Sequence, residues 1–135
     1  MVRKGYFREL AQQSLLRYSA MGETAMSESA ETVRRLTSRL GSQSGVAELL
    51  DVDRSSISRW LRKTDTPDAE NKAKLDALDF VYKRLLQTLE ADTARKWLTG
   101  ANAHLGNRRP IDLLIRNRVA EVVAAIEETA TGSYA

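Results

Sequence analysis

Cationic and hydroxyl side chains are concentrated in one short stretch of the chain, between residues 54 and 63. No acidic residue interrupts it. Guanidinium groups bind guanine edges and phosphates, and serines near the start of a helix let its backbone approach a phosphate. The chemistry that this stretch favours is recognition of DNA. The residues concerned are Arg54, Ser55, Ser56, Ser58, Arg59, Arg62 and Lys63.

Residue types that carry catalysis are scarce. The chain has no cysteine and a single histidine, His104, with no cluster of other metal ligands around it in the sequence. No glycine-rich phosphate loop, nucleophile elbow or HExxH motif occurs. We therefore expect no enzymatic activity, no metal site and no cofactor, with His104 as a surface or capping residue.

Composition predicts an all-α protein. The 135 residues are 42% hydrophobic and 29% charged, with only two prolines and seven glycines, so long helices with short connections are expected. This length suits one ordinary domain or two very small helical ones that share a core. The net charge of +3 is compatible with nucleic acid, although the basic excess falls within residues 1–40. No apolar run suits a membrane span or a signal peptide, so we expect a cytoplasmic protein with no membrane partner.

The basic stretch belongs to a longer pattern over residues 46–61 that is typical of a helix-turn-helix. Ala47 is small where two helices would cross closely, and Val52 would fill the space under the turn. Ile57 with Trp60 and Leu61 would seat the second helix, expected over residues 54–63, on the first, expected over residues 45–50. Asp51 stands where a positive φ is favoured, and aspartate is one of the few residues that tolerate it.

If Ile57, Trp60 and Leu61 face inward, helical geometry turns the basic stretch outward, toward solvent or DNA. Such motifs usually act as dimers on two-fold sites, so a homodimer bound to double-stranded DNA is expected. The alternative is a helical hairpin whose outer face is merely solvated. Arg59 is placed to reach a guanine edge or a phosphate.

The elements before the motif are expected to be a helix over residues 6–19, a loop over residues 19–24 and a helix from Ser29. Ala30, Val33, Leu36 and Leu40 share one stripe of that last helix, and Gly41 would end it.

Beyond the motif, Thr66 is expected to cap a long helix with Pro67 as its first residue. A seam of apolar residues along it would pack against another helix or a partner chain. A shorter helix over residues 92–98, a polar connector over residues 102–109, a helical turn over residues 110–114 and a last helix around residues 119–126 should follow. The seam consists of Leu75, Leu78, Tyr82, Leu85 and Leu89.

These elements suggest three parts. Residues 1–28 form a helix and a loop of unclear role, residues 29–74 the helix-turn-helix domain, and residues 75–135 a helical domain with a C-terminal tail.

The last part carries a resemblance. The order Trp-Leu at 97–98, Asn at 102, Leu-Gly at 105–106, Arg-Pro at 109–110 and Asp-Leu at 112–113, with the ending at 132–135, resembles the toxin-binding region of the Xre/MbcA/ParS antitoxin family. With the helix-turn-helix, the resemblance covers about the last two-thirds of the chain. It implies operator binding by the motif and binding of a RES-domain toxin, an NAD-consuming enzyme whose active site the C-terminal region blocks.

Several residues of this region are candidates for toxin contact. Arg108 and Arg109, beside Pro110, present forked donors suited to a carboxylate or a phosphate, or else lie in a solvated loop. Asn102 is expected to cap the following turn, and Trp97 with Leu98 to belong to the core. Tyr134 suits an intermolecular pocket, with disorder as the alternative. The candidate toxin-binding residues are Asn102, Arg108, Arg109, Asp112, Gly132, Ser133, Tyr134 and Ala135.

The resemblance predicts the antitoxin of a type II toxin–antitoxin system that also regulates its own operon. Two other functions stay open at this point. One is a stand-alone transcription regulator whose last sixty residues serve dimerisation or ligand sensing, and the other is an interaction module that no longer contacts DNA.

Overall fold

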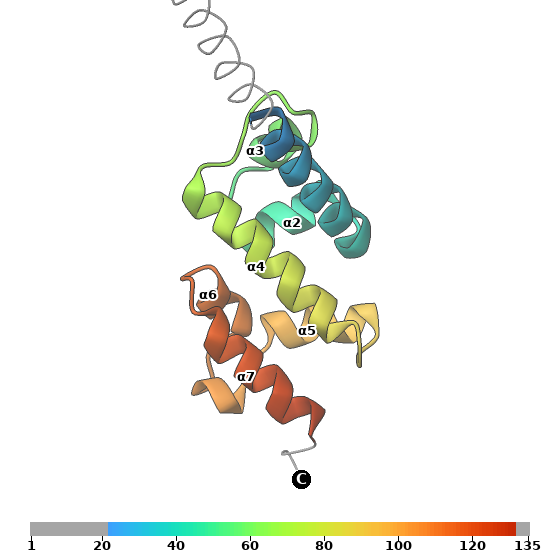
Figure 1. The fold of residues 1–135 in the computed structure, drawn as a ribbon. Helices are drawn as coiled ribbons and strands as arrows, with labels where there is room; N and C mark the ends of the chain where they lie inside the picture. Colours follow the sequence, from blue (N-terminus) through green and yellow to red (C-terminus); the bar gives the residue numbers. More distant parts are fainter. Residues whose placement is uncertain (1–21, 132–135) are drawn as a thin grey trace, which may run out of the picture.

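The computed structural model describes residues 22–131, whose regular elements are all helices, so the predicted all-α class is confirmed (Figure 1). The helix expected over residues 6–19 lies outside the described residues. The elements are a helix over residues 22–40, α2 (Gln43–Leu50), α3 (Arg54–Leu61), α4 (Ala69–Leu85), α5 (Ala91–Thr99), the short 3₁₀ helix η1 (Ala103–Leu105), α6 (Pro110–Leu114) and α7 (Val119–Ala130).

The helix over residues 22–40 carries the predicted apolar stripe. Ala30, Val33, Leu36 and Leu40 are all buried, and Gly41 follows with a φ of 90°. The prediction of a loop over residues 19–24 is wrong for residues 22–24, which are helical. A single glycine costs a helix only about 1 kcal/mol, and no proline stops the helix from extending through it.

Two short helices, α2 and α3, pack against each other across a three-residue turn, as predicted. Ser42 caps α2 by accepting a hydrogen bond of 2.9 Å from the amide of Gly45, so α2 begins at Gln43, two residues earlier than expected. Asp51 has the expected positive φ, 54°. Ile57 and Trp60 are buried and Leu61 is half-buried against the core, which leaves the opposite face of α3 outward.

The start of α4 differs from the prediction. Asp68, not Thr66, is the N-cap, because its carboxylate accepts a hydrogen bond of 2.8 Å from the amide of Asn71. Pro67 is buried ahead of the helix instead of forming its first turn. Both Thr and Asp are good caps, so the local sequence offers two possible starts for this helix.

The predicted seam of α4 packs within the chain. Leu75, Leu78, Tyr82 and Leu85 are buried, whereas Leu89 lies past the end of the helix and is half-buried. α7 packs against α4, α6 and η1, and α5 packs against α6. The Tyr82 hydroxyl donates to the carbonyl of Ala91 at 3.2 Å, which ties α4 to the start of α5, and burial raises its pKa.

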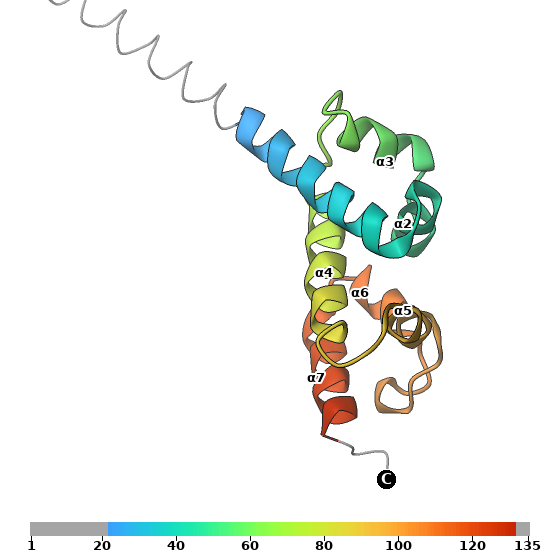
Figure 2. The same cartoon turned by 90° about the vertical axis from the view of Figure 1, so that its right-hand side faces the viewer.

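One hydrophobic core runs through the described residues, from Val33 to Ile126. The predicted boundary between residues 74 and 75 falls inside α4, which continues across it. In Figure 2, the helix over residues 22–40 crosses the first half of α4, and the second half lies with α5, α6 and α7. α4 is therefore the element shared by the two ends of the molecule.

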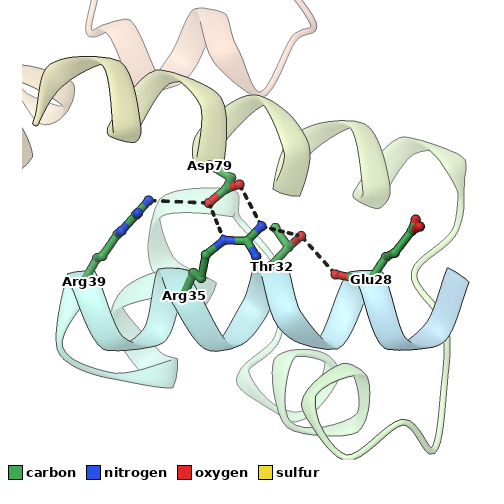
Figure 3. A network of polar contacts seen from close by, with 5 residues as sticks. All are labelled: Glu28, Thr32, Arg35, Arg39 and Asp79. Carbon is green, nitrogen blue, oxygen red and sulfur yellow. Dashed lines mark hydrogen bonds and ion pairs between the residues drawn. The ribbon is translucent and has the colours of Figure 1, made fainter. Parts of the chain in front are cut away.

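A polar network holds the helix over residues 22–40 against α4 (Figure 3). Arg35 donates to Asp79 through Nη2 at 3.0 Å and through Nε at 3.5 Å. Arg39 Nη1 lies 3.7 Å from the same carboxylate. Thr32 accepts from Arg35 at 3.3 Å and donates to the carbonyl of Glu28 at 3.0 Å. The hydrogen bonds to Asp79 raise the pKa of Arg35 and keep its charge in place.

Candidate functional site

The orientation of α3 is set by the two residues that anchor it in the core. Because Ile57 and Trp60 are buried, helical geometry turns the side chains on the opposite side of the helix outward. The predicted DNA-contacting residues therefore share one side of the α2–α3 unit. Those that are exposed are Arg54, Ser55, Arg59, Arg62 and Lys63, and those that are half-buried are Ser56 and Ser58.

α3 ends at Leu61, two residues before the predicted end. Lys63 adopts a positive φ of 61°, and the amide of Thr64 bonds to the carbonyl of Arg59 at 3.0 Å, which closes the helix. Arg62 and Lys63 consequently project from the turn after the helix. At the other end, Asp53 is the N-cap residue of α3, but its side chain makes no capping hydrogen bond.

Arg59 is engaged within the chain. Its Nη2 donates to the Ser56 hydroxyl at 3.1 Å, and its Nε lies 3.6 Å from a carboxylate oxygen of Asp65. Asp65 was missed by sequence reasoning, because a residue beyond the helix end is brought back only by the turn. Arg54 and Arg62, in contrast, form no ion pair within the part of the chain that the structure describes.

In the C-terminal half, Asn102 organises the connector between α5 and α6. Its side chain accepts a hydrogen bond of 2.9 Å from the amide of His104, as expected of a cap, and it is 5% exposed. Its backbone amide donates to the carbonyl of Arg108 at 3.1 Å. Asn102 therefore shapes the loop that presents the two following arginines.

Arg108 and Arg109 point to different partners. Arg108 Nε donates to the carbonyl of Leu105 at 2.8 Å, and its Nη2 lies 3.8 Å from Glu121 of α7. Arg109 makes a two-pronged contact with Asp112, at 2.9 and 2.7 Å. This pair holds the pKa of Asp112 below its usual range and raises the pKa of Arg109. The two arginines are thus held in place without a partner protein.

The Arg109–Asp112 pair lines a crevice between α2 and the C-terminal helices, beside Glu48 and Arg95. The crevice was not predicted, since nothing in the local sequence indicates that α2 approaches α5 and α6. Glu121 was missed too. It accepts two hydrogen bonds from Arg118, at 2.8 and 2.9 Å, and the spacing of three residues at a helix start is a signal that points to such a pair.

The remaining predictions concern core residues, His104, metal and membrane features, and the C-terminal tail. Leu98 is buried and Trp97 is half-buried against the core, as expected. His104 is half-buried and pairs with Glu128. Within residues 22–131, no three potential ligands come together as a metal site, and no helix has the length and apolar character of a membrane span. The predicted contact residues Gly132, Ser133, Tyr134 and Ala135 lie outside the described residues.

Comparison with known proteins identifies the family. Residues 85–128 match the antitoxin Xre/MbcA/ParS C-terminal toxin-binding domain. A crystal structure of the M. tuberculosis MbcT–MbcA toxin–antitoxin complex contains a chain that is 32% identical and superposes with a TM-score of 0.65. The match covers 76% of this chain and 94% of that one. The protein belongs to the Xre/MbcA/ParS antitoxin family.

In this Xre/MbcA/ParS-family protein, the toxin-binding match begins at the last residue of α4 and extends into α7. It includes Asn102, Arg108, Arg109 and Asp112, whereas α3 and the tail lie outside it. No curated protein matches the chain.

Proposed function

We propose that this protein is the antitoxin of a type II pair, which binds and inhibits a RES-domain, NAD-consuming toxin and has no catalytic activity of its own. The observation that carries the proposal is the toxin-binding match over residues 85–128, supported by the likeness to a chain of the MbcT–MbcA complex. We further propose that it acts in the cytoplasm and represses its own operon as a homodimer on double-stranded operator DNA.

The toxin-binding role falls on the connector and on the tail. The guanidinium groups of Arg108 and Arg109 are about half exposed and are paired with Glu121 and Asp112. These contacts restrict both side chains before a partner binds, which reduces the side-chain entropy lost on binding. Asn102 acts by positioning this loop. Gly132, Ser133, Tyr134 and Ala135 would enter the toxin as a plug.

Co-expression with the product of the neighbouring reading frame tests this role. Deletion of residues 132–135, or the Arg108→Ala substitution, should relieve growth inhibition less well than the full chain and should weaken co-purification with the toxin. Arg62→Ala is the matched control, because it removes an arginine from the α3 side and should neutralise normally. A toxin that is neither bound nor neutralised by the full chain would contradict the proposal.

The DNA-binding role falls on the outer face of α3. We assign contacts with bases or phosphates to Arg54, Ser55, Ser56, Ser58, Arg59, Arg62 and Lys63, and the exposed cations at both ends of α3 support this assignment.

Binding to the promoter fragment of its own operon, measured at several salt concentrations, tests the assignment. Arg54→Ala and Arg62→Ala should each weaken binding and lower the salt slope by about one phosphate contact. Asp65→Asn should tighten binding, because it releases Arg59 from an intramolecular carboxylate. Arg108→Ala is the control that should leave operator binding unchanged. Equal binding by all four variants would rule out α3 as the DNA contact.

A further inference from the structure

One helix face of the molecule is exposed and partly apolar. Phe80 of α4 is the only large apolar side chain exposed within residues 22–131, at 53%. It lies opposite the buried Leu78 and Tyr82, since helical geometry separates the two faces. We call the exposed residues on this face the α4 outer stripe. They are Ala69, Ala73, Asp76, Phe80 and Lys83.

The outer stripe has opposite charges on the two sides of its apolar centre. Asp76 lies one turn before Phe80, and Lys83 lies one turn after it. Neither forms an ion pair within 4 Å among the described residues. The order along the stripe is an acid, an aromatic residue and a base. When two copies lie antiparallel, the acid of each copy faces the base of the other, so the stripe is complementary to itself.

We propose that the α4 outer stripe is a homodimer interface, in which two α4 helices pack antiparallel with Phe80 on the two-fold axis. Such an isologous contact places Asp76 of each copy opposite Lys83 of the other. The two alanines before Asp76 allow the helices to approach closely, and the paired phenylalanines bury each other.

The surface beside the stripe fits the same partner. A groove between the helix over residues 22–40 and α4 is lined by four carboxylates and two cations, so its charge is negative on balance. The charged lining residues are Glu23, Glu28, Glu31, Asp76, Arg35 and Lys72. The groove receives the end of the second α4 that carries Lys83. A stable dimer buries roughly 1,200–2,000 Å² in total, more than one helix stripe supplies, so the groove is a necessary part of the interface.

The placement of the stripe favours a second copy over a toxin. The toxin-binding match begins at Leu85, whereas the stripe ends at Lys83. In Figure 2, α2, α3, α5 and α6 lie to one side of α4, and the helix over residues 22–40 crosses its first half. The inference deepens the proposed operator binding by a homodimer, because it names the surface that joins the two copies.

Sedimentation velocity of the full chain over a range of concentrations tests the inference. The unaltered protein should dimerise, and Phe80→Glu should raise the dimer dissociation constant at least about tenfold. Asp76→Lys and Lys83→Asp should each weaken the dimer by like-charge contact. The double charge reversal should restore it, because each pair forms between copies. Lys96→Asp, an exposed charge change on α5, is the control that should have no effect.

A cysteine variant gives a second readout. The chain has no cysteine, so oxidation of the Phe80→Cys variant should form a covalent dimer across the axis, whereas Ala124→Cys, on the exposed side of α7, should not form one. Circular dichroism verifies that each variant is folded.

Two results would overturn the inference: a monomer at every concentration, or a dimer that persists in folded Phe80→Glu and that the Phe80→Cys variant does not cross-link. Neutralisation of the toxin by the same variants separates this from the proposed function. A monomer that still neutralises would leave the antitoxin proposal intact. Loss of neutralisation by a Phe80→Glu protein that still dimerises would assign the stripe to the toxin.

Discussion

Replacing Asp79 with alanine should loosen the helix over residues 22–40 from α4. The Asp79 carboxylate receives both Arg35 and Arg39, and its side chain is only 20% exposed (Figure 3). Removing this carboxylate leaves the guanidinium groups of Arg35 and Arg39 without their shared counter-charge. The Nη1 atom of Arg39 is buried and has no hydrogen bond, so it depends on this charge.

The expected loss lies between two known limits. A fully exposed ion pair contributes about 0–1 kcal/mol, and breaking a fully buried one costs about 3–5 kcal/mol. The side chains of Arg35 and Arg39 are 46% and 31% exposed, which places this cluster between the limits. We expect Asp79→Ala to lower the free energy of unfolding by about 2 kcal/mol, and the melting temperature by about 6 °C for a chain of this size.

Urea unfolding followed by far-UV circular dichroism measures this loss. Glu70→Ala is the matched control, because it removes the exposed carboxylate of a pair with Lys74 on α4 and should cost less than about 1 kcal/mol. A double-mutant cycle between Asp79→Ala and Arg35→Ala should give a coupling of about 1 kcal/mol. Equal losses in Asp79→Ala and Glu70→Ala, or strict additivity in the cycle, would refute the reasoning.

Three other predictions concern the turn, the core and the loss of folding stability at acidic pH. Asp51→Gly should leave the free energy of unfolding equal or slightly higher, and Asp51→Val should lower it by about 1–2 kcal/mol, because φ is 54° there; equal stability of both variants in urea would contradict this. Ile57→Ala should cost about 3 kcal/mol in the same assay, since Ile57 is fully buried, and a loss below that of half-buried Leu61→Ala would contradict the packing. Arg109 depresses the pKa of Asp112 in the folded state, so the pair stabilises above the unfolded pKa of about 3.9 and this contribution is lost as pH falls through the lower folded value. Asp112→Asn should therefore flatten the acid limb of stability against pH, and an Asp112 titration by NMR at the ordinary midpoint would argue against the pair.

Much of the fold follows from local sequence. The stripe from Ala30 to Leu40 and the positive φ at Asp51 depend on helical period and on conformational preference, which act within a few residues. The same is true of α6, which begins at Pro110 as predicted. Such features do not depend on contacts between helices.

The start of α4 shows where local preference is insufficient. Thr66 and Asp68 are both good N-caps, and the sequence alone favoured the residue before Pro67. In the structure Asp68 is the cap, and Pro67 is buried ahead of the helix. A local pattern that offers two good caps does not decide between them.

The candidate sites divide in the same way. The sequence by itself determined that Ile57 and Trp60 face inward and that the cations of α3 face outward, because one helical period decides both. Only the tertiary structure decided that Arg108 lies beside Glu121 and that Asp79 meets two arginines from another helix. These contacts join residues whose separation along the chain says nothing about their distance in space, so they exist only once the helices have packed.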